Sequence, residues 1–274
     1  MRPLFALVAL LTVLPAQAQS LFWDGAGVGT TGAQGGTGTW DTNTTANWFD
    51  GSTNVVWPNA GTNNDAVFGG TAGTVTIASV SANDLTFSTT GYSLQGASTL
   101  TLNGTTNIIT TGTGVSATIG NNTATVLAGT AGFIKAGSGT LILNPTTAAT
   151  YTGPTTISGG QLTLDFSNLG SNAANLLPSG GNLTFDGTKT TDAKVVLQNA
   201  VGGGATLQTF GAITNGRGAS YVLANPAAGT TMTVTASSIA LGGTRGWNST
   251  NGTVIIGVMQ ASQESQFTFN LRIL

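Results

Sequence analysis

The sequence predicts an all-β fold in which the chain coils into a parallel β-solenoid. From residue 73 onward it consists of short segments with alternating side chains, each ended by Gly, Asn or Asp, which is the pattern of β-strands joined by turns. A motif of the form Leu-x-Leu or Leu-x-Phe, followed by Asn or Asp, recurs among these segments. Past Ser20 no helical apolar period persists over three turns, so we expect essentially no helix.

Residues 1–18 have the character of a secretory signal peptide. They contain one basic residue, Arg2, then an apolar run from Leu4 to Leu14, a breaker at Pro15, and the small-x-small cleavage site Ala16-Gln17-Ala18. The apolar run is too short for a transmembrane helix, which needs about 20 apolar residues. We therefore expect an exported mature chain with no transmembrane segment.

The segment 19–72 is rich in large aromatic side chains. It holds Trp23, Trp40, Trp48 and Trp57 among loops of Gly, Thr and Asn. A solenoid needs an atypical end that covers its open apolar cross-section. We therefore predict an aromatic N-terminal cap over 19–72.

Solenoid repeats are predicted over 73–260 from the spacing of the recurring motif. The interval from Leu141 to Leu162 is the same as the interval from Leu162 to Leu183. A period of this size predicts single-stranded coils of about 20–24 residues that share a continuous core. A β-sandwich, with turn signals every 8–12 residues or so, is the competing architecture, but it gives no reason for the motif to repeat. On this alignment four motif ends would stack near one turn, namely Asn103, Asn144, Asp165 and Asp186.

The segment 261–274 contains one further amphipathic strand. Phe267, Phe269, Leu271 and Ile273 alternate with polar residues. We expect this segment to be a C-terminal cap strand or a truncated end.

One stretch resembles the autotransporter-associated β-strand repeat. Lys135-Ala-Gly-Ser-Gly-Thr-Leu-Ile-Leu-Asn144 is followed, after a short turn, by Tyr151-Thr-Gly-Pro-Thr-Thr-Ile-Ser-Gly-Gly-Gln-Leu-Thr-Leu164, so that the best copy spans 135–164. The resemblance implies a right-handed parallel β-helix passenger, secreted or at the cell surface of a Gram-negative-type bacterium. The residues that match the repeat are Lys135, Gly137, Gly139, Leu141, Leu143, Tyr151, Gly153, Thr155, Ile157, Gly160, Leu162 and Leu164.

Composition excludes several classes of chemistry. The chain has no His and no Cys, so it has no thiolate nucleophile, no Ser-His-Asp triad and no zinc site of the usual type. Only 7 residues are Lys or Arg, too few for the basic surface that nucleic-acid binding needs. We expect no catalytic residues, no cofactor and no metal, and a structural, display or adhesion role.

Acidic side chains supply the alternative of a polysaccharide-degrading β-helix protein. Asp165, Asp186 and Asp192 could come together on adjacent coils, and two suitably spaced carboxylates can hydrolyse a glycosidic bond without His. Calcium binding through Asp24, Asp41, Asp50 or the run Asn63-Asn64-Asp65 is a second alternative. Each Asp lies at a strand end or in a loop, where its side chain ordinarily bonds to the backbone, and this interpretation is favoured.

Glycans and other copies of the chain are the expected partners. Exposed aromatic rings can stack on sugars, and the candidate glycan contacts are Trp40, Trp48, Trp57 and Tyr151. The competing interpretation, that the Trp rings fill the core of the cap, is favoured because large aromatic side chains are mostly buried. Low charge and high β-propensity also favour self-association through strand edges.

Overall fold

The computed structural model describes residues 19–25, 32–58, 64–169, 174–186, 193–198, 205–216, 219–241, 253–258 and 266–271. The predicted signal peptide, residues 1–18, and Asp192 lie outside the described residues.

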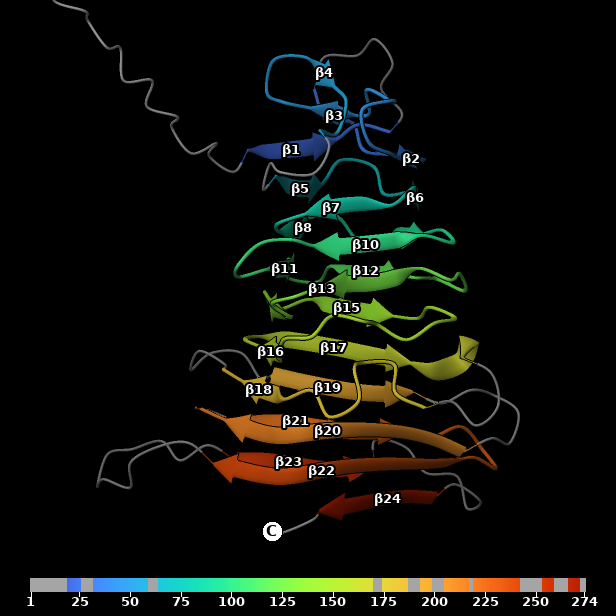
Figure 1. Ribbon diagram of the computed structural model, residues 1–274, viewed down its shortest axis with the longest axis vertical. Coiled ribbons are helices and arrows are strands. Elements are labelled where there is room, and N and C mark those ends of the chain that lie inside the picture. The colour runs from blue at the N-terminus through green and yellow to red at the C-terminus, as the bar shows by residue number, and fades with distance from the viewer. Residues whose placement is uncertain are drawn as a thin grey trace, which may run out of the picture.

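The described strands form three sheets that run along a stack of coils (Figure 1). Sheet 1 contains twelve strands, in the spatial order β4 (Asn54–Val55), β3 (Trp48–Phe49), β1 (Ser20–Trp23), β5 (Asp65–Phe68), β8 (Leu85–Phe87), β11 (Ile108–Thr111), β14 (Phe133–Ala136), β16 (Thr155–Ile157), β18 (Leu183–Phe185), β20 (Ala205–Asn215), β22 (Thr231–Leu241) and β24 (Gln266–Leu271).

The other two sheets complete the coils. Sheet 2 contains β2 (Gly38–Trp40), β6 (Thr74–Ile77), β9 (Tyr92–Gln95), β12 (Ser116–Ile119), β15 (Thr140–Leu143), β17 (Gly160–Asp165), β19 (Ala193–Gln198), β21 (Ala219–Asn225) and β23 (Thr253–Val258). Sheet 3 contains β7 (Val80–Ala82), β10 (Thr99–Leu102) and β13 (Val126–Gly129).

The chain visits the sheets in turn, so each coil adds one strand to each wall. From β5 to β13 the order is sheet 1, sheet 2, sheet 3, repeated three times. Among the described strands the pairings between successive coils are parallel, and the antiparallel pairs are β1 with β3 and β3 with β4 at the N-terminal end. This topology is a parallel β-solenoid, which confirms the predicted fold class.

Past β13, residues 149–150 and 174–176 continue the third wall outside named strands, and residues 174–176 stack on the first half of β20. The backbone N–H of Thr150 donates to the Leu127 carbonyl at 2.9 Å, and the N–H of Ala149 donates to the Leu176 carbonyl at 2.9 Å. The N–H of Asn175 donates to the Leu207 carbonyl at 2.7 Å. Stacked hydrogen bonds therefore still join the coils along this wall.

Coil length varies more than the motif predicts. Leu141 pairs with Leu162, which agrees with the expected coil length, but Leu162 pairs with Val195, which is a much longer step along the chain. The predicted length is therefore correct for some coils and wrong for others. The strands must keep register for their hydrogen bonds, whereas the turns lie outside the ladder and tolerate insertions.

The proposed stacking of the four motif ends is also wrong. Leu100 lies in sheet 3, Leu141 and Leu162 lie in sheet 2, and Leu183 lies in sheet 1. Of the motif ends, Asn144 and Asp165 are on neighbouring coils, and the Asn144 amide donates to the Asp165 carbonyl at 3.1 Å. Any inward-facing strand that ends in a turn produces the same motif, so it does not identify one wall.

The core is a column of inward-facing aliphatic side chains that ends in an aromatic cluster near β1, β3 and β4. The Trp48 and Trp57 ring centroids are 4.5 Å apart, and those of Trp40 and Trp57 are 4.9 Å apart. Phe68 stacks on Phe87 of the next coil with centroids 4.9 Å apart. These rings fill the cross-section where the parallel coils begin.

Among the described residues the helical element is a single 3-10 turn, Phe166–Asn168. No helix in the described part of the chain is long and apolar enough to cross a membrane.

Candidate functional site

Lys135 lies at the start of the repeat copy, and its side chain points into the solenoid. Its side chain is fully buried on β14. The ammonium Nζ donates to three carbonyl oxygens, those of Ala136 at 2.8 Å, Gly137 at 3.0 Å and Gly159 at 3.2 Å. An ammonium has three N–H groups, so every donor has an acceptor. Desolvation lowers the pKa of Lys135 to about 8. The side chain ties together the turns of two successive coils.

Two of the repeat glycines allow these turns to stack closely. Gly137 has φ +75° and Gly160 has φ +64°, a region that L-residues with a Cβ rarely adopt. A Cβ on Gly137 would lie 2.2 Å from the Thr111 carbonyl oxygen, and one on Gly160 would lie 2.4 Å from the Gly139 carbonyl oxygen. Both positions therefore require glycine for conformation and for space.

Tyr151 fills the corner of the repeat that precedes β16. Its hydroxyl forms a hydrogen bond of 2.5 Å with the Thr155 Oγ1, and its ring meets Phe133 edge-on with centroids 5.4 Å apart. Burial raises the pKa of Tyr151 above its ordinary value. The ring is part of the core.

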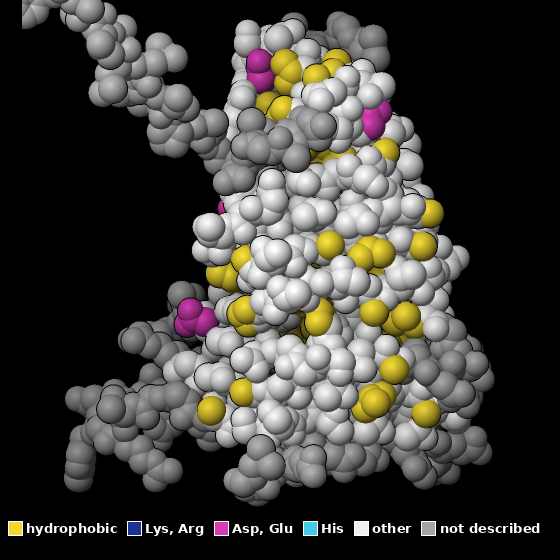
Figure 2. All heavy atoms as spheres, in the orientation of Figure 1, with side chains coloured by type: hydrophobic (Ala, Val, Ile, Leu, Met, Phe, Trp, Pro, Cys, Tyr) yellow, Lys and Arg dark blue, Asp and Glu magenta, His cyan; other side chains and the backbone are white. Residues whose placement is uncertain are grey.

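The outer face of sheet 1 carries a column of β-branched side chains. Ile134 pairs with Thr156, Thr156 with Thr184, and Thr184 with Thr214, each on the next coil. All four are half-buried. In the view of Figure 2 the described surface is mainly neutral and polar, with scattered apolar side chains and few acidic ones. The surface offers hydroxyl groups and methyl groups, with little charge.

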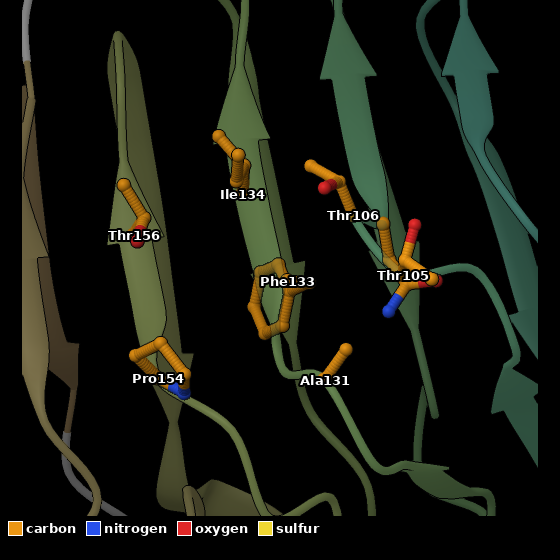
Figure 3. A pocket seen from close by; sticks show the side chains of 8 residues that line it. Thr105, Thr106, Ala131, Phe133, Ile134, Pro154 and Thr156 are labelled. Atoms are coloured by element: carbon orange, nitrogen blue, oxygen red, sulfur yellow. The ribbon is translucent and has the colours of Figure 1, made fainter.

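A pocket of about 170 Å³ opens at the edge of this column, where β11, β14 and β16 begin. Figure 3 shows the Phe133 ring in the middle of the labelled side chains, with Pro154 on one side and Ala131 on the other. The threonines that line the pocket are Thr105, Thr106 and Thr156. The pocket therefore belongs to the same segment as the repeat.

Residues 133–164 match the family model of the passenger-associated-transport-repeat. The chain carries an autotransporter passenger-type repeat. The match covers the strands β14, β15, β16 and β17, and with them Lys135, Tyr151 and the repeat glycines.

A curated relative extends the similarity beyond the passenger repeat. The protein named adhesin BmaC autotransporter, from Brucella suis biovar 1 (strain 1330), is 40% identical over 190 residues, which is 67% of this chain and 5% of the adhesin. The chain thus aligns with about one twentieth of that protein's length. No solved structure matches the chain.

The four rings predicted as glycan contacts lie in the interior. Trp40 and Trp48 are 0% exposed, and Trp57 and Tyr151 are 1% exposed. A sugar cannot stack on a ring that has no accessible face, so this structure does not support the glycan-contact interpretation for these residues. The Trp rings are buried because they pack against one another in the aromatic cluster. A ring that the sequence did not single out, Phe22, is 38% exposed.

Asp165 and Asp186, two of the acidic candidates for catalysis, lie on different walls of the solenoid. Asp165 ends β17 in sheet 2, and its Oδ1 accepts the Ser167 N–H at 3.0 Å. Asp186 follows β18 in sheet 1, and its backbone N–H donates to the Ile157 carbonyl. The predicted approach of the two on adjacent coils is wrong because their strands belong to different sheets.

The acidic candidates for calcium hold turns of the first coils. Asp24 accepts the Gln34 N–H at 3.0 Å and the Asn54 amide at 2.8 Å. Asp50 accepts the backbone N–H groups of its own turn, which lower its pKa, and Asp41 accepts the Thr45 N–H at 2.8 Å. These hydrogen bonds hold loops and turns in place, which is the role that the sequence favours for these Asp side chains.

The pocket is the feature that sequence reasoning missed. Its lining comes from three successive turns, near residues 105, 131 and 154. The pocket can be located only when the strand pairing between successive coils is known, and the recurring motif predicts that pairing incorrectly.

Proposed function

We propose that the protein is an exported bacterial passenger protein that mediates adhesion through its solenoid surface and performs no catalysis. The observation that carries the proposal is the passenger repeat within a chain that is 40% identical, over 190 residues, to a protein named as an adhesin. The proposed location is outside the cell or at the cell surface.

The fold supports this role through rigidity. Parallel ladders join successive coils in sheets 1 and 2, backbone hydrogen bonds continue along the third wall, and the aromatic cluster fills the N-terminal cross-section. A rigid scaffold presents surface side chains with little loss of conformational entropy on binding. The outer column of Ile134, Thr156, Thr184 and Thr214 has such a fixed spacing.

The titratable groups support a role without catalysis. Lys135 is bonded to three carbonyl oxygens, and the carboxylates of Asp24, Asp41, Asp50 and Asp165 accept turn N–H groups. Acid–base catalysis needs a titratable pair directed at one reacting group. These residues instead serve the turns, so we expect no hydrolytic activity.

Extracellular glycans and further copies of the chain are the proposed partners. The surface is neutral and rich in hydroxyl groups, which both donate and accept hydrogen bonds. The chain has 7 basic residues, and one of the described ones, Lys135, is buried. Nucleic acid is therefore not a proposed partner.

The test is binding of the exported chain to a panel of immobilised glycans and extracellular-matrix proteins, with released sugars assayed in the same wells. We expect saturable binding to at least one surface and no released product. Heat-unfolded protein at the same concentration is the control for nonspecific adsorption. Absence of saturable binding to every surface, or released oligosaccharides, would contradict the proposal.

A further inference from the structure

We infer that the pocket at the start of β11, β14 and β16 is a binding site for a single neutral sugar residue. This inference rests on the proposed adhesive function and adds a ligand class and a place of binding to it.

The pocket is preformed because buried hydrogen bonds fix the turns that line it. The Asn107 amide is 1% exposed, and its Oδ1 accepts the Gly104 N–H at 2.7 Å while its Nδ2 donates to the Gly132 carbonyl at 2.8 Å. The Asn107 carbonyl also accepts the Ile134 N–H at 2.8 Å. One side chain thereby joins two coils at the wall of the pocket.

The third turn is fixed to the second by a close backbone contact. The Phe133 N–H donates to the Pro154 carbonyl at 3.2 Å. Gly132 has φ +72°, and a Cβ there would lie 2.0 Å from that same carbonyl oxygen. A ligand therefore enters a site whose backbone is already ordered, which lowers the entropic cost of binding.

The lining chemistry matches the two kinds of surface on a sugar ring. Ala131, Ile134 and Pro154 supply apolar atoms, and Thr105, Thr106 and Thr156 supply hydroxyl groups. A pyranose has C–H faces that pack on apolar side chains and hydroxyl groups that exchange hydrogen bonds with threonine. At about 170 Å³ the pocket is well below the ~300 Å³ at which pockets for larger ligands begin, so it suits one sugar residue.

Charge favours a neutral sugar over an acidic one. No charged side chain lines the pocket, within the part of the chain that the structure describes. Asp84, on the preceding coil, accepts the Ile108 N–H at 2.7 Å, so a carboxylate lies beside the strand that begins shortly after Thr106. An anionic sugar would find no partner cation in the lining and would approach a like charge.

Sheet geometry disfavours an extended peptide. β11, β14 and β16 are interior strands of sheet 1, each paired on both sides. A peptide that binds by strand addition needs an open edge with free N–H and carbonyl groups. The strands at this pocket offer no such edge.

The test is ligand-observed NMR on the exported chain, with the methyl glycosides of glucose, galactose, mannose and N-acetylglucosamine as probes and methyl glucuronide for comparison. We expect saturable binding of at least one neutral probe, with a Kd of about 1–10 mM because one sugar in a small site makes few contacts. The glucuronide is expected to bind more weakly.

Three variants locate the binding. Thr106→Trp places a large ring at the mouth and should abolish binding, and Thr156→Val, which removes one hydroxyl at nearly constant shape, should weaken it about three- to tenfold. Thr184→Val makes the same change at the paired position on the next coil, outside the pocket lining, and should leave the Kd unchanged. Circular dichroism and melting curves confirm that each variant is folded.

The inference is overturned if no neutral probe saturates, if the folded Thr106→Trp variant binds like the wild type, or if the glucuronide binds as tightly as the neutral probes. A second assay tests the adhesive function by itself. It measures the adhesion of beads coated with the wild-type chain to immobilised glycans and extracellular-matrix proteins. If the coated beads adhere but no neutral probe binds, the sugar-site inference is wrong and the adhesive function stands. Beads that do not adhere would contradict the adhesive function itself.

Discussion

Lys135 is a cation inside a core of aliphatic and aromatic side chains, and its three hydrogen bonds explain why it is tolerated there. An isolated buried charge is strongly unfavourable, but each N–H of this ammonium meets a backbone carbonyl. These carbonyls belong to the end of β14, the turn that follows it and the turn that precedes β17. The residue that heads the repeat is thus a connector between coils, and it does not present its charge to a partner.

The lowered pKa of Lys135 predicts that stability rises with pH between about 8 and 10.5. The folded pKa is about 8 and the ordinary value is 10.5. Below pH 8 both states hold the proton, and between these values the unfolded chain binds more protons than the folded chain. The free energy of unfolding should therefore increase with pH, by at most about 1.4 kcal/mol per pH unit.

Denaturant unfolding at several pH values from about 7 to 9.5 measures this effect. Lys135→Met removes the titrating group, so its difference from the wild type isolates the Lys135 contribution from other ionisations. Lys194→Met, at a half-buried position on the outer face of sheet 2, is the matched control. A wild-type curve that runs parallel to that of Lys135→Met would contradict the assignment.

Gly137 provides a second test at the level of one residue. Gly137→Ala introduces both a strained φ and a contact of 2.2 Å with the Thr111 carbonyl, so we expect a loss of more than about 2 kcal/mol. Gly114 has nearly the same φ, +72°, and open space around it. Gly114→Ala therefore isolates the strain, about 1–2 kcal/mol. Equal losses in melting or denaturant curves would show that close packing at Gly137 is unimportant.

Among the elements, alternation and turn residues predicted most of the strands. The strands β6, β10, β15 and β17 are alternating segments of the kind predicted from residue 73 onward, and the parallel stacking follows from the repeat. The wall that each strand joins could not be predicted, because an inward-facing Leu-x-Leu looks the same on every wall. The pocket depends on that register, and so it was missed.

For the aromatic cluster too, the composition predicts that the region is special, but it does not predict where each ring lies. Its richness in Trp predicted a special N-terminal region, and the rings do pack together. Which rings are exposed depends on the antiparallel pairing of β1 with β3, which sets Trp23 opposite Trp48 and Phe22 opposite Phe49. The Trp pair is buried, whereas Phe22 is exposed, and the sequence alone does not distinguish these two sides.

Trp48→Ala should destabilise the fold by about 3–5 kcal/mol, because it leaves a cavity in the aromatic cluster. Phe22→Ala, on the exposed side of the same pair of strands, should cost less than about 1 kcal/mol. Chemical denaturation with tryptophan fluorescence and circular dichroism compares the two. Similar losses in both variants would contradict the burial of Trp48 as the basis of its role.

At the scale of the whole molecule, the low charge predicts adhesion that depends little on salt. Charged residues form 6% of the chain, and screening acts on interactions between exposed charges. Binding through hydroxyl and apolar groups should change less than about twofold between roughly 50 and 500 mM NaCl. A loss of about tenfold or more over that range would indicate that charged contacts carry the adhesion.

The most direct measurement is the adhesion of beads coated with residues 19–274 to immobilised glycans and extracellular-matrix proteins, counted against bead dose and competed with the soluble chain. We expect saturable adhesion that the folded soluble chain inhibits, with no sugar or peptide released from the surface. Adhesion at the level of beads coated with the unfolded chain, or release of cleaved surface material, would contradict an adhesive, non-catalytic solenoid.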